Sequence, residues 1–371
     1  MTAHIIYFNY LKPDGRGMSI GGIQTYITNL VPVLRSEGFE VSIYQRGDSD
    51  FVVEENGATV YGVKTENPYG KDTIRSIYEF AKTKIDAKTD LLIFGCESCA
   101  VPCGEFRSVA IQHGISWDVP EFEGCSDRSY LYQYVRKCKH AWDTVKRVSL
   151  PQTLVCVDYN FINWYRAIVP YPKVHLKAIP NFTEIPAVKY EKQDDVVRII
   201  FARRFFKHRG TRIFADAMVR VLSKYERIEV TVAGTGPDEK YVSNRLASFP
   251  NVKFTTYSSG ESMRIHQDKD IAVVPTVGSE GTSLSLLEAM AAGCAVICTN
   301  VGGMTNLVFD HFNGLMISPE EEFLYKAVCE LIENRELRER LQRNASAVVN
   351  QSFSLEVWQE RWKEVIREAM S

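Results

Sequence analysis

Short apolar runs alternate with amphipathic helical segments along the whole chain, in two series that a polar stretch separates. Strand-like runs occupy residues 4–9, 40–45, 90–94, 108–113 and 153–158 in the first series, and 196–202, 228–233, 252–255, 270–275, 294–298 and 314–317 in the second. This alternation is typical of doubly wound parallel sheets and disfavours all-β folds and helical bundles. We therefore predict an α/β fold with two doubly wound, Rossmann-like domains.

The polar stretch EIPAVKYEKQDD, which begins at Glu184, marks the boundary between the two series. It contains a proline and no hydrophobic periodicity, as linkers do. A chain of 371 residues is also long enough for two domains. We predict a first domain at 1–182, a linker at 183–195, a second domain at 196–352 and a separate helix at 353–371. That helix, with Trp358 and Trp362 on one face, caps its own domain or crosses back to the first, and the sequence leaves both open.

The composition excludes several classes of protein. The chain carries 44 Lys and Arg against 46 Asp and Glu, so its net charge of −2 gives no global footprint for nucleic acid. No apolar stretch approaches the roughly 18 residues that a transmembrane helix needs, and the first residues lack the pattern of a signal peptide. We therefore expect a cytoplasmic protein.

Nine cysteines, an odd number, are scattered over both series. Cys96 and Cys99 form a CxxC pair close to Cys103, but no second pair completes a zinc pattern. We interpret these residues as reduced structural thiols and predict neither a metal site nor a cofactor.

Two glycine-rich loops follow predicted strands and precede helices. Gly21-Gly22 follows the first strand of the chain, and Gly234 and Gly236 follow residues 228–233. Glycines at a strand-to-helix turn let backbone N–H groups approach an anion or a sugar. Neither spacing is diagnostic, and a flexible connector explains the first loop better than a binding site does.

A cationic loop follows the first strand of the second series. Just before Gly210 it contains Arg203, Arg204, Lys207, His208 and Arg209. Guanidinium groups at the carboxyl edge of a parallel sheet suit a diphosphate, whereas the simpler interpretation is a solvated basic loop. The residues alone do not decide between the two.

The most specific loop runs from Pro275 to Gly293. Ser283 is placed to cap a helix whose amino-terminal N–H groups point out of the sheet edge. Glu280 lies in the loop and Glu288 on the second turn of the helix, and such a pair can accept hydrogen bonds from several sugar hydroxyls. A solvated surface position explains Glu288 poorly, because its neighbours are apolar.

These motifs, in this order, resemble a retaining glycosyltransferase of the GT-B fold, glycosyltransferase family 4. The matching residues are Gly21-Gly22, Arg204 with Arg209-Gly210 five residues later, Gly234-x-Gly236, Glu280-x7-Glu288 followed by AMAAG, Gly302-Gly303 and Asn313-Gly314-Leu315. The resemblance covers nearly the whole chain, strongly over 196–320 and thinly over 40–150. It implies two domains that face a central cleft, the first binding an acceptor and the second a nucleotide-sugar donor.

The resemblance also implies roles for individual residues. Arg204 and Arg209 would hold the donor diphosphate, Glu288 the ribose hydroxyls and Glu280 the hydroxyls of the transferred sugar. Further donor contacts are implied for Gly21, Gly22, Arg203, Gly234, Gly236, Gly281, Thr282, Ser283 and Leu284. The chain departs from the family pattern at Arg209, where Lys is commoner, and at Arg203, where Gly is usual. Which of Arg203 and Arg204 points toward the phosphates therefore stays open.

His113 ends a strand-like run, where a histidine is more often a packed residue than a catalytic one. The resemblance implies that it faces the donor sugar, and it makes Asp118 a second candidate for contact with the acceptor. The implied reaction moves a sugar from a nucleotide diphosphate sugar to a hydroxyl group, with retention of the anomeric configuration and without a metal.

The acceptor implied by the resemblance is a glycan or a lipid-linked molecule, in the assembly of polysaccharide, lipopolysaccharide or glycolipid. Two alternatives stay open from the sequence. One is a sugar-nucleotide epimerase of similar fold, and the other is a non-catalytic protein that binds a sugar nucleotide or a glycan.

Residues 128–150 carry six Lys or Arg and one acidic residue, Asp143, so their local net charge is six minus one, or +5. Read as a helix, the segment has a core-facing stripe of Tyr134, Cys138, Ala141, Val145 and Val148. It is either a solvated helix or a surface that contacts an anionic membrane. The second interpretation would place the protein at the inner face of the membrane.

Overall fold

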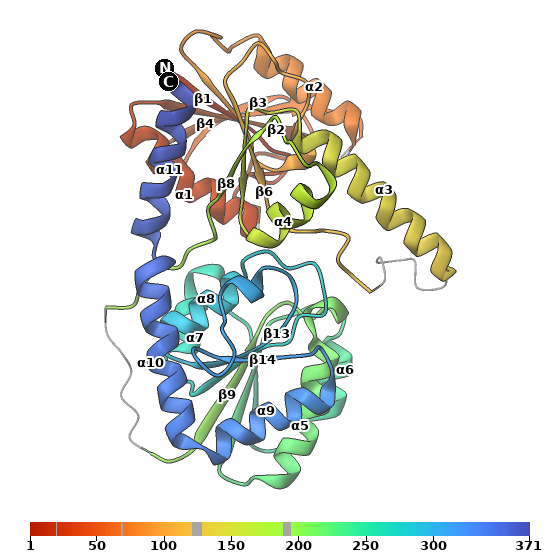
Figure 1. The fold of residues 1–371 in the computed structure, drawn as a ribbon, viewed down its shortest axis with the longest axis vertical. Coiled ribbons are helices and arrows are strands. Elements are labelled where there is room, and N and C mark those ends of the chain that lie inside the picture. The colour runs from red at the N-terminus through yellow and green to blue at the C-terminus, as the bar shows by residue number, and fades with distance from the viewer. Residues whose placement is uncertain (20, 68–69, 121–127, 188–193) are drawn as a thin grey trace. The chain divides into compact units, whose positions relative to one another are not determined.

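The computed structural model describes residues 1–19, 21–67, 70–120, 128–187 and 194–371. The chain folds as two compact units (Figure 1). Unit 1 consists of Met1–His113, Arg128–Pro180 and Trp358–Ser371, and unit 2 consists of Gly114–Asp127 and Asn181–Val357. Residues 188–193 of the predicted linker lie outside the described residues.

Within the described part of unit 1, eight strands form one sheet in the order β3-β4-β2-β1-β5-β6-β7-β8. The strands are β1 (Thr2–Ile6), β2 (Glu40–Gly47), β3 (Phe51–Glu55), β4 (Ala58–Lys64), β5 (Leu91–Phe94), β6 (Ser108–Gln112), β7 (Thr153–Cys156) and β8 (His175–Ala178). Neighbouring strands pair in parallel, apart from the antiparallel pair β3 and β4. The strand order reverses at β1, so the sheet is doubly wound.

The β3–β4 hairpin is not among the predicted strands. Its turn is Asn56-Gly57, with φ values of 49° and 79°. Both turn residues of a type I′ hairpin need positive φ, and Asn-Gly is the pair that meets this need most readily. The dipeptide Asn56-Gly57 is therefore the sequence signal for this hairpin. The alternation of strands and helices, from which the strands were predicted, does not reveal it.

Four helices accompany the sheet in the described part of unit 1, in addition to the C-terminal helix. They are α1 (Gly22–Ser36), α2 (Lys71–Lys82), α3 (Tyr130–Val148) and α4 (Tyr159–Ile168), and a single 3-10 turn covers Glu97–Cys99. α1 buries Ile27, Leu30 and Leu34, and α2 buries Ile74 and Ile77. These apolar faces cover the sheet, as the period of 3.6 residues requires.

α3 differs from its predicted packing. Val145 and Val148 are buried, but Tyr134 and Cys138, predicted on the same core-facing stripe, are exposed. The reason is visible in Figure 1, where the amino-terminal half of α3 extends away from the rest of unit 1. Only the carboxyl-terminal turns of this helix therefore have a core to face.

The C-terminal helix α11 (Leu355–Met370) belongs to unit 1 from Trp358 onward. Trp358 and Trp362 are buried and meet the ring of Tyr26 on α1 edge-on, with ring centroids 5.0 and 6.1 Å away. The indole N–H of Trp362 donates to the Tyr26 hydroxyl at 2.8 Å. Arg367 adds a two-pronged ion pair with Glu37, with distances of 2.7 and 2.8 Å.

Within the described part of unit 2, six parallel strands form a sheet in the order β11-β10-β9-β12-β13-β14. The strands are β9 (Val197–Ala202), β10 (Ile228–Ala233), β11 (Val252–Thr255), β12 (Ile271–Val274), β13 (Ala295–Thr299) and β14 (Leu315–Ile317). The helices are α5 (Thr211–Lys224), α6 (Glu239–Leu246), α7 (Ser262–His266), α8 (Leu284–Ala291), α9 (Glu321–Glu333) and α10 (Arg335–Ser352).

The strands of the unit 2 sheet are apolar on both faces. Ile199 and Phe201 of β9 join one buried cluster with α5 and α9, whereas Ile200 and Ala202 join another with α8 and α10. A sheet covered by helices on both sides is the α/β architecture that the alternating pattern predicts, and the predicted fold class is confirmed. Among the helices that the structure describes, none is long and apolar enough to cross a membrane.

We expect Trp362→Ala to lower the free energy of unfolding of unit 1 by about 3–5 kcal/mol, because it removes a fully buried aromatic side chain and its hydrogen bond to Tyr26. Urea denaturation followed by circular dichroism measures the change. Glu364→Ala, on the exposed side of the same helix, is the matched control and should change stability by less than about 0.5 kcal/mol. A loss below about 1 kcal/mol in Trp362→Ala would contradict this account of the packing.

Candidate functional site

The strand order of unit 2 reverses between β9 and β12, which pair in parallel. Loops that leave the carboxyl ends of two such strands diverge to opposite faces and leave a crevice in which ligands commonly bind. The loop after β9 holds the cationic residues of the sequence analysis, including a 3-10 turn at Lys207–Arg209. The loop after β12 holds Glu280. Parallel pairing therefore brings two of the predicted motifs to one sheet edge.

Glu280 is the centre of this edge. Its Oε2 atom accepts hydrogen bonds from Arg203 Nη2 at 2.6 Å, from Arg209 Nη1, and from Thr276 Oγ1 at 3.1 Å. Arg203 also donates to Thr276 Oγ1 through its other terminal nitrogen. One carboxylate thus holds two guanidinium groups from the neighbouring loop.

The charges of Arg203 and Arg209 determine the ionisation of Glu280. Burial by itself would raise the pKa of Glu280, but the positive charges of Arg203 and Arg209 lower it to about 2. Glu280 is therefore ionised at neutral pH. Two guanidinium groups against one carboxylate leave the cluster with one uncompensated positive charge, which suits an anionic ligand.

The two adjacent arginines of the loop point in different directions. Arg203 is 8% exposed and reaches Glu280, whereas Arg204 is exposed and lies with its guanidinium carbon 5.5 Å from the ring centre of Phe206. The family resemblance implied that Arg204 and Arg209 hold the diphosphate, and it left open which of Arg203 and Arg204 points toward the phosphates. The structure brings Arg203 and Arg209 together, and it does not bring Arg204 to them.

Close backbone packing explains two glycines at this edge. Gly210 has a φ of 77°, and a Cβ atom there would overlap the carbonyl group of Pro275. Gly302 has a φ of 55°, and a Cβ atom there would overlap the carbonyl oxygen of Glu280. Both positions combine a left-handed backbone with lack of space, so only glycine fits. These contacts fix the backbone that carries Glu280.

The loop after β12 leads into α8. Thr282 and Ser283 are buried, and α8 begins at Leu284 with Ser283 as its N-cap residue. The Ser283 side chain makes no capping hydrogen bond, contrary to the prediction, and instead lies 3.3 Å from the hydroxyl of Ser285. The side-chain amide of Asn181 donates to the Thr282 carbonyl at 2.7 Å. The amino-terminal N–H groups of α8 are therefore not all occupied by a cap.

Glu288 lies on the second turn of α8, as predicted. Its Oε2 atom accepts a hydrogen bond from the hydroxyl of Ser262 on α7. Burial raises the pKa of Glu288 to about 7, and the bond from Ser262 offsets only part of that effect. A carboxyl group with a pKa near neutrality can ionise when hydroxyl donors reach it.

The predicted glycine turn after β10 also lies at this edge. Gly234 donates its N–H to the Thr255 carbonyl at 3.0 Å, and Phe205 donates to the carbonyl of Thr235 at 2.8 Å. Asp238 then donates its N–H to the Phe205 carbonyl at 3.0 Å. The Gly234-x-Gly236 turn therefore braces the backbone of the arginine loop.

Other predicted site residues belong to unit 1. His113 follows β6, and its Nε2 atom lies 2.9 Å from the carbonyl oxygen of Gly95. Burial lowers the pKa of His113 to about 4, so the ring is neutral at physiological pH. A neutral ring that donates through Nε2 to a carbonyl keeps Nδ1 as a hydrogen-bond acceptor. Gly21 and Gly22 form the start of α1, where Gly21 is the N-cap residue.

Asp118, the second candidate for acceptor contact, belongs to unit 2 and is exposed. Its carbonyl oxygen accepts the backbone N–H of Ser279, next to Glu280. The structure therefore places Asp118 beside the loop after β12.

The three cysteines of the sequence analysis lie after β5. Cys96 and Cys99 are buried with their sulfur atoms 3.2 Å apart, and Cys103 is buried as well. Across the described residues, the His, Cys, Asp and Glu side chains form no group of three that could hold a metal ion.

Sequence reasoning missed two polar residues of this site. Thr276 bridges Arg203 and Glu280, and Ser262 holds Glu288. Thr276 directly follows the strand-end Pro275, so its place in the loop was a usable signal. Ser262 lies on a separate five-residue helix, and only the tertiary fold brings it to α8.

A family model agrees with this assembly of motifs. Residues 183–348 match the model described as Glycosyl transferases group 1. This stretch is a glycosyltransferase group 1 domain. It contains Arg203, Arg209, Glu280 and Glu288, and it covers most of unit 2.

Two relatives match parts of the chain. A glycosyltransferase of Methanocaldococcus jannaschii is 27% identical over 271 residues, which are 71% of this chain and 66% of the relative. Phosphatidyl-myo-inositol mannosyltransferase of Mycobacterium leprae is 24% identical over 146 residues, which are 38% of this chain and 39% of the relative. The aligned chain thus spans slightly less than two thirds of the first relative and about two fifths of the second.

The whole fold matches a solved structure. Anabaena HepE, in complex with UDP-glucose, superposes with a TM-score of 0.71 at 14% sequence identity, covering 99% of this chain and 100% of HepE. The protein has the GT-B fold.

We expect Glu280→Gln to lower the free energy of unfolding of unit 2 by about 3–5 kcal/mol, because it leaves the buried Arg203 charge without its partner. Urea denaturation measures the loss. Glu239→Gln, on the exposed surface of α6, is the control and should change stability little. The double variant Arg203→Met, Glu280→Gln should recover part of the loss.

The pH dependence of stability tests the same cluster. The pKa of Glu280 is about 2 in the folded chain, against 4.5 for a glutamate that is freely exposed to water. A depressed carboxyl pKa stabilises the fold above pH 4.5, and this stabilisation is lost as pH falls toward 2. Glu280→Gln should lack that part of the acid-induced loss. Equal acid sensitivity of the variant and the wild type would contradict the ion cluster.

Proposed function

We propose that the protein is a glycosyltransferase that moves a sugar from a nucleotide diphosphate sugar to a hydroxyl acceptor with retention of the anomeric configuration. The observation that carries this proposal is the Arg203–Glu280–Arg209 cluster at the topological switch point of a glycosyltransferase group 1 domain. A diphosphate is the anion that such a pair of guanidinium groups binds well. The UDP-glucose in the HepE complex supports a nucleotide-sugar as donor.

Leaving-group stabilisation is the task that these residues can perform. Cleavage of the anomeric bond develops positive charge on the sugar ring and negative charge on the departing diphosphate. Arg203, Arg209 and the N–H groups at the start of α8 would stabilise that negative charge in a partly buried site, where electrostatic interactions are strong. Cationic side chains would thereby take the place of a metal ion, and we propose that the reaction needs none.

Glu280 and Glu288 would orient the donor. Glu280 stays ionised and keeps acceptor capacity beyond its arginine partners, so it can accept hydrogen bonds from hydroxyls of the transferred sugar. Glu288 would accept hydrogen bonds from the ribose hydroxyls. These would replace the hydrogen bond that it now accepts from Ser262. His113 would accept, through Nδ1, a hydrogen bond from a hydroxyl of the donor sugar.

Retention without an enzymic nucleophile implies attack by the acceptor on the face from which the diphosphate leaves. In this proposal a phosphate oxygen of the leaving group takes the proton of the acceptor hydroxyl. The acceptor is a glycan or a lipid-linked molecule, and the phosphatidyl-myo-inositol mannosyltransferase relative supports the lipid-linked class.

We further propose that α3 contacts an anionic membrane surface. Large apolar side chains are exposed along this helix: Tyr130 at 85%, Leu131 at 68%, Val135 at 58%, Trp142 at 57%, Tyr134 at 56% and Tyr132 at 46%. Cationic groups lie over two of the rings, with Arg128 5.7 Å from Tyr132 and Lys146 5.3 Å from Trp142. Aromatic and basic side chains on one protruding helix are typical of interfacial binding.

We expect Arg209→Ala to weaken UDP binding by about 1.5–3 kcal/mol, the range for hydrogen bonds to charged groups. Isothermal titration calorimetry measures the affinity. Arg204→Ala is the matched control, because Arg204 is the neighbouring exposed arginine outside the Glu280 cluster, and its loss should be clearly smaller. Unchanged affinity in Arg209→Ala would remove the arginine clamp from the proposal.

We expect turnover to continue in EDTA and to give a product with the anomeric configuration of the donor. Proton NMR of the product reads the configuration, with a panel of glycan and lipid-linked acceptors as substrates. An inverted anomer would exclude retention, and loss of activity that Mg²⁺ or Mn²⁺ restores would exclude metal independence. Donor conversion without any acceptor would favour an epimerase, and binding without turnover a non-catalytic protein.

We expect the protein to sediment with anionic vesicles at low salt and to be released at 1 M salt, because the Debye screening length shortens to about 3 Å at that concentration. Each basic residue near an anionic surface contributes roughly 1 kcal/mol, so the triple variant Lys137→Glu, Lys139→Glu, Lys146→Glu should lose most of the binding. Leu131→Ser with Val135→Ser should weaken it without changing the charge. Neutral vesicles are the control, and failure to bind anionic vesicles would make α3 a solvated helix.

A further inference from the structure

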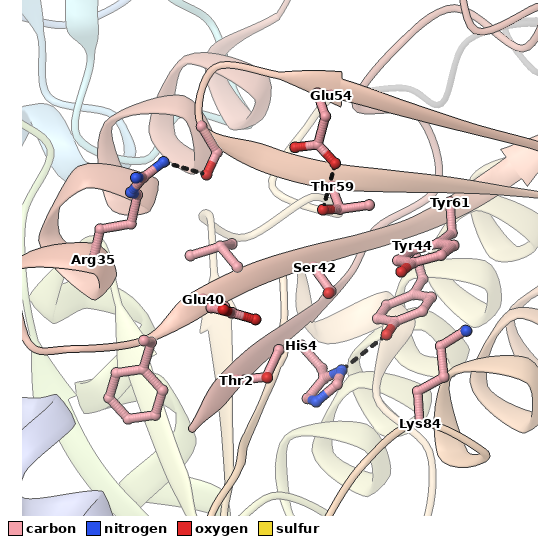
Figure 2. Close-up of a pocket in the computed structure, with 13 residues that line it drawn as sticks. Thr2, His4, Arg35, Glu40, Ser42, Tyr44, Glu54, Thr59, Tyr61 and Lys84 are labelled. Carbon is pink, nitrogen blue, oxygen red and sulfur yellow. Dashed lines mark hydrogen bonds between the residues drawn. The ribbon is translucent and has the colours of Figure 1, made fainter.

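A pocket lies in unit 1, on the face of its sheet at the amino-terminal half of β1, β2 and β4. Figure 2 shows the side chains that line this cavity of about 530 Å³. Within unit 1, the candidate site residue His113 follows the carboxyl end of β6, whereas this pocket lies at the amino-terminal half of the strands. Its volume falls within the usual range of ligand pockets, roughly 300–1,000 Å³.

The floor of the pocket is polar where a sheet face is usually apolar. Strand register aligns Glu54 with Thr59, Thr59 with Ser42 and Ser42 with His4, so one row of polar side chains crosses four strands. Faces of parallel strands are normally covered by helices and lined by aliphatic residues. A hydroxyl-bearing floor therefore indicates a polar occupant.

The next row toward the carboxyl ends is aromatic and closes the pocket on that side. Tyr44 and Tyr61 are register partners whose rings stack at 5.1 Å, and both rings contact Phe80 of α2. α2 ends at Lys82, and Lys84 lies 4.9 Å from the centre of the Tyr61 ring. α2 therefore covers the aromatic row, and the pocket lies next to the part of the sheet that α2 does not cover.

Buried hydrogen bonds fix the polar groups at the base of the pocket. Asp90 accepts the backbone N–H groups of Thr2 at 2.8 Å and Asp86 at 2.9 Å, and it lies 3.2 Å from His4 Nε2. An ionised Asp90 makes Nε2 the protonated nitrogen of His4, so that Nδ1 accepts the Tyr44 hydroxyl at 2.9 Å. Because the Tyr44 O–H points toward His4, the lone pairs of the Tyr44 oxygen have a fixed direction and can accept a hydrogen bond.

The charged side chains that line the pocket balance, and Asp90, which is hydrogen-bonded to His4 and to two backbone N–H groups, is not among them. Arg35 and Lys84 contribute two positive charges, and Glu40 and Glu54 contribute two negative charges. Arg35 donates to the Gly57 carbonyl at 3.0 Å, and Glu54 accepts from the Thr59 hydroxyl at 2.7 Å. Burial lowers the pKa of His4, which leaves it neutral. A strongly charged ligand would meet as much repulsion as attraction here.

We propose that this pocket binds a neutral oligosaccharide. A sugar supplies hydroxyl groups that both donate and accept, which matches a lining of hydroxyls, two carboxylates, a guanidinium group and an ammonium group whose charges cancel. The inference goes beyond the proposed transfer reaction, since no residue of the donor site takes part. For a glycan-building enzyme, the pocket would hold a sugar segment away from the reacting hydroxyl.

Hydrogen exchange of the full chain, read by mass spectrometry, tests this inference. The probes are maltotriose, cellotriose and triacetylchitotriose at millimolar concentration. We expect at least one of them to slow exchange in peptides that cover β2 and β4. UDP added separately reports on the loop at 275–284, so that failure of the donor proposal is distinguishable from failure of this one.

The variants are chosen to keep the fold. Glu40→Ala removes an exposed carboxylate, and Thr59→Val replaces a hydroxyl by a methyl group of similar size. Together they should weaken the sugar-induced protection at least fivefold, whereas Glu79→Ala, exposed on α2, should leave it unchanged. Absence of protection with all three sugars, or protection that persists in the double variant, would overturn the proposal.

Discussion

The buried carboxylate of Glu280 is the element around which the candidate donor site is arranged. An ionised carboxylate inside a protein is costly unless it is paired and hydrogen-bonded. Arg203, Arg209 and Thr276 supply those partners, and they lower the pKa of Glu280 to about 2 although burial alone would raise it. The same interaction holds two guanidinium groups in place before any ligand arrives. A site that is already ordered loses little conformational entropy when it binds an anion.

The surrounding backbone explains how such a cluster is positioned. Gly210 lies against Pro275 and Gly302 lies against Glu280, both with left-handed backbones and without room for a side chain. These contacts join the loop after β9 to the start of the loop after β12, and the loop after β13 to Glu280. A small shift of any one loop would separate Glu280 from Arg203. The close packing at these glycines therefore helps to keep the ion pair together.

Unit 1 distributes polar and apolar groups in an unusual way for a doubly wound sheet. One face of its sheet carries the polar row that ends at His4, and α3 exposes several aromatic side chains. In contrast, α11 buries Trp358 and Trp362 against Tyr26. Apolar burial thus fixes the C-terminal helix, and the polar row and the exposed helix remain available for interactions beyond the core.

Sequence alone determined the local properties of this protein: the alternation of strands and helices, and the residue types that follow β9, β10 and β12. These follow from hydrophobic period and from turn chemistry, which neighbouring residues fix. It could not choose between Arg203 and Arg204, because the direction of a side chain in a loop depends on which charge lies opposite. It also could not bring Ser262 to Glu288, expose Tyr134 on α3 or assign α11 to unit 1. Only the tertiary structure decided these, since each requires residues that are distant in the chain to share one small volume.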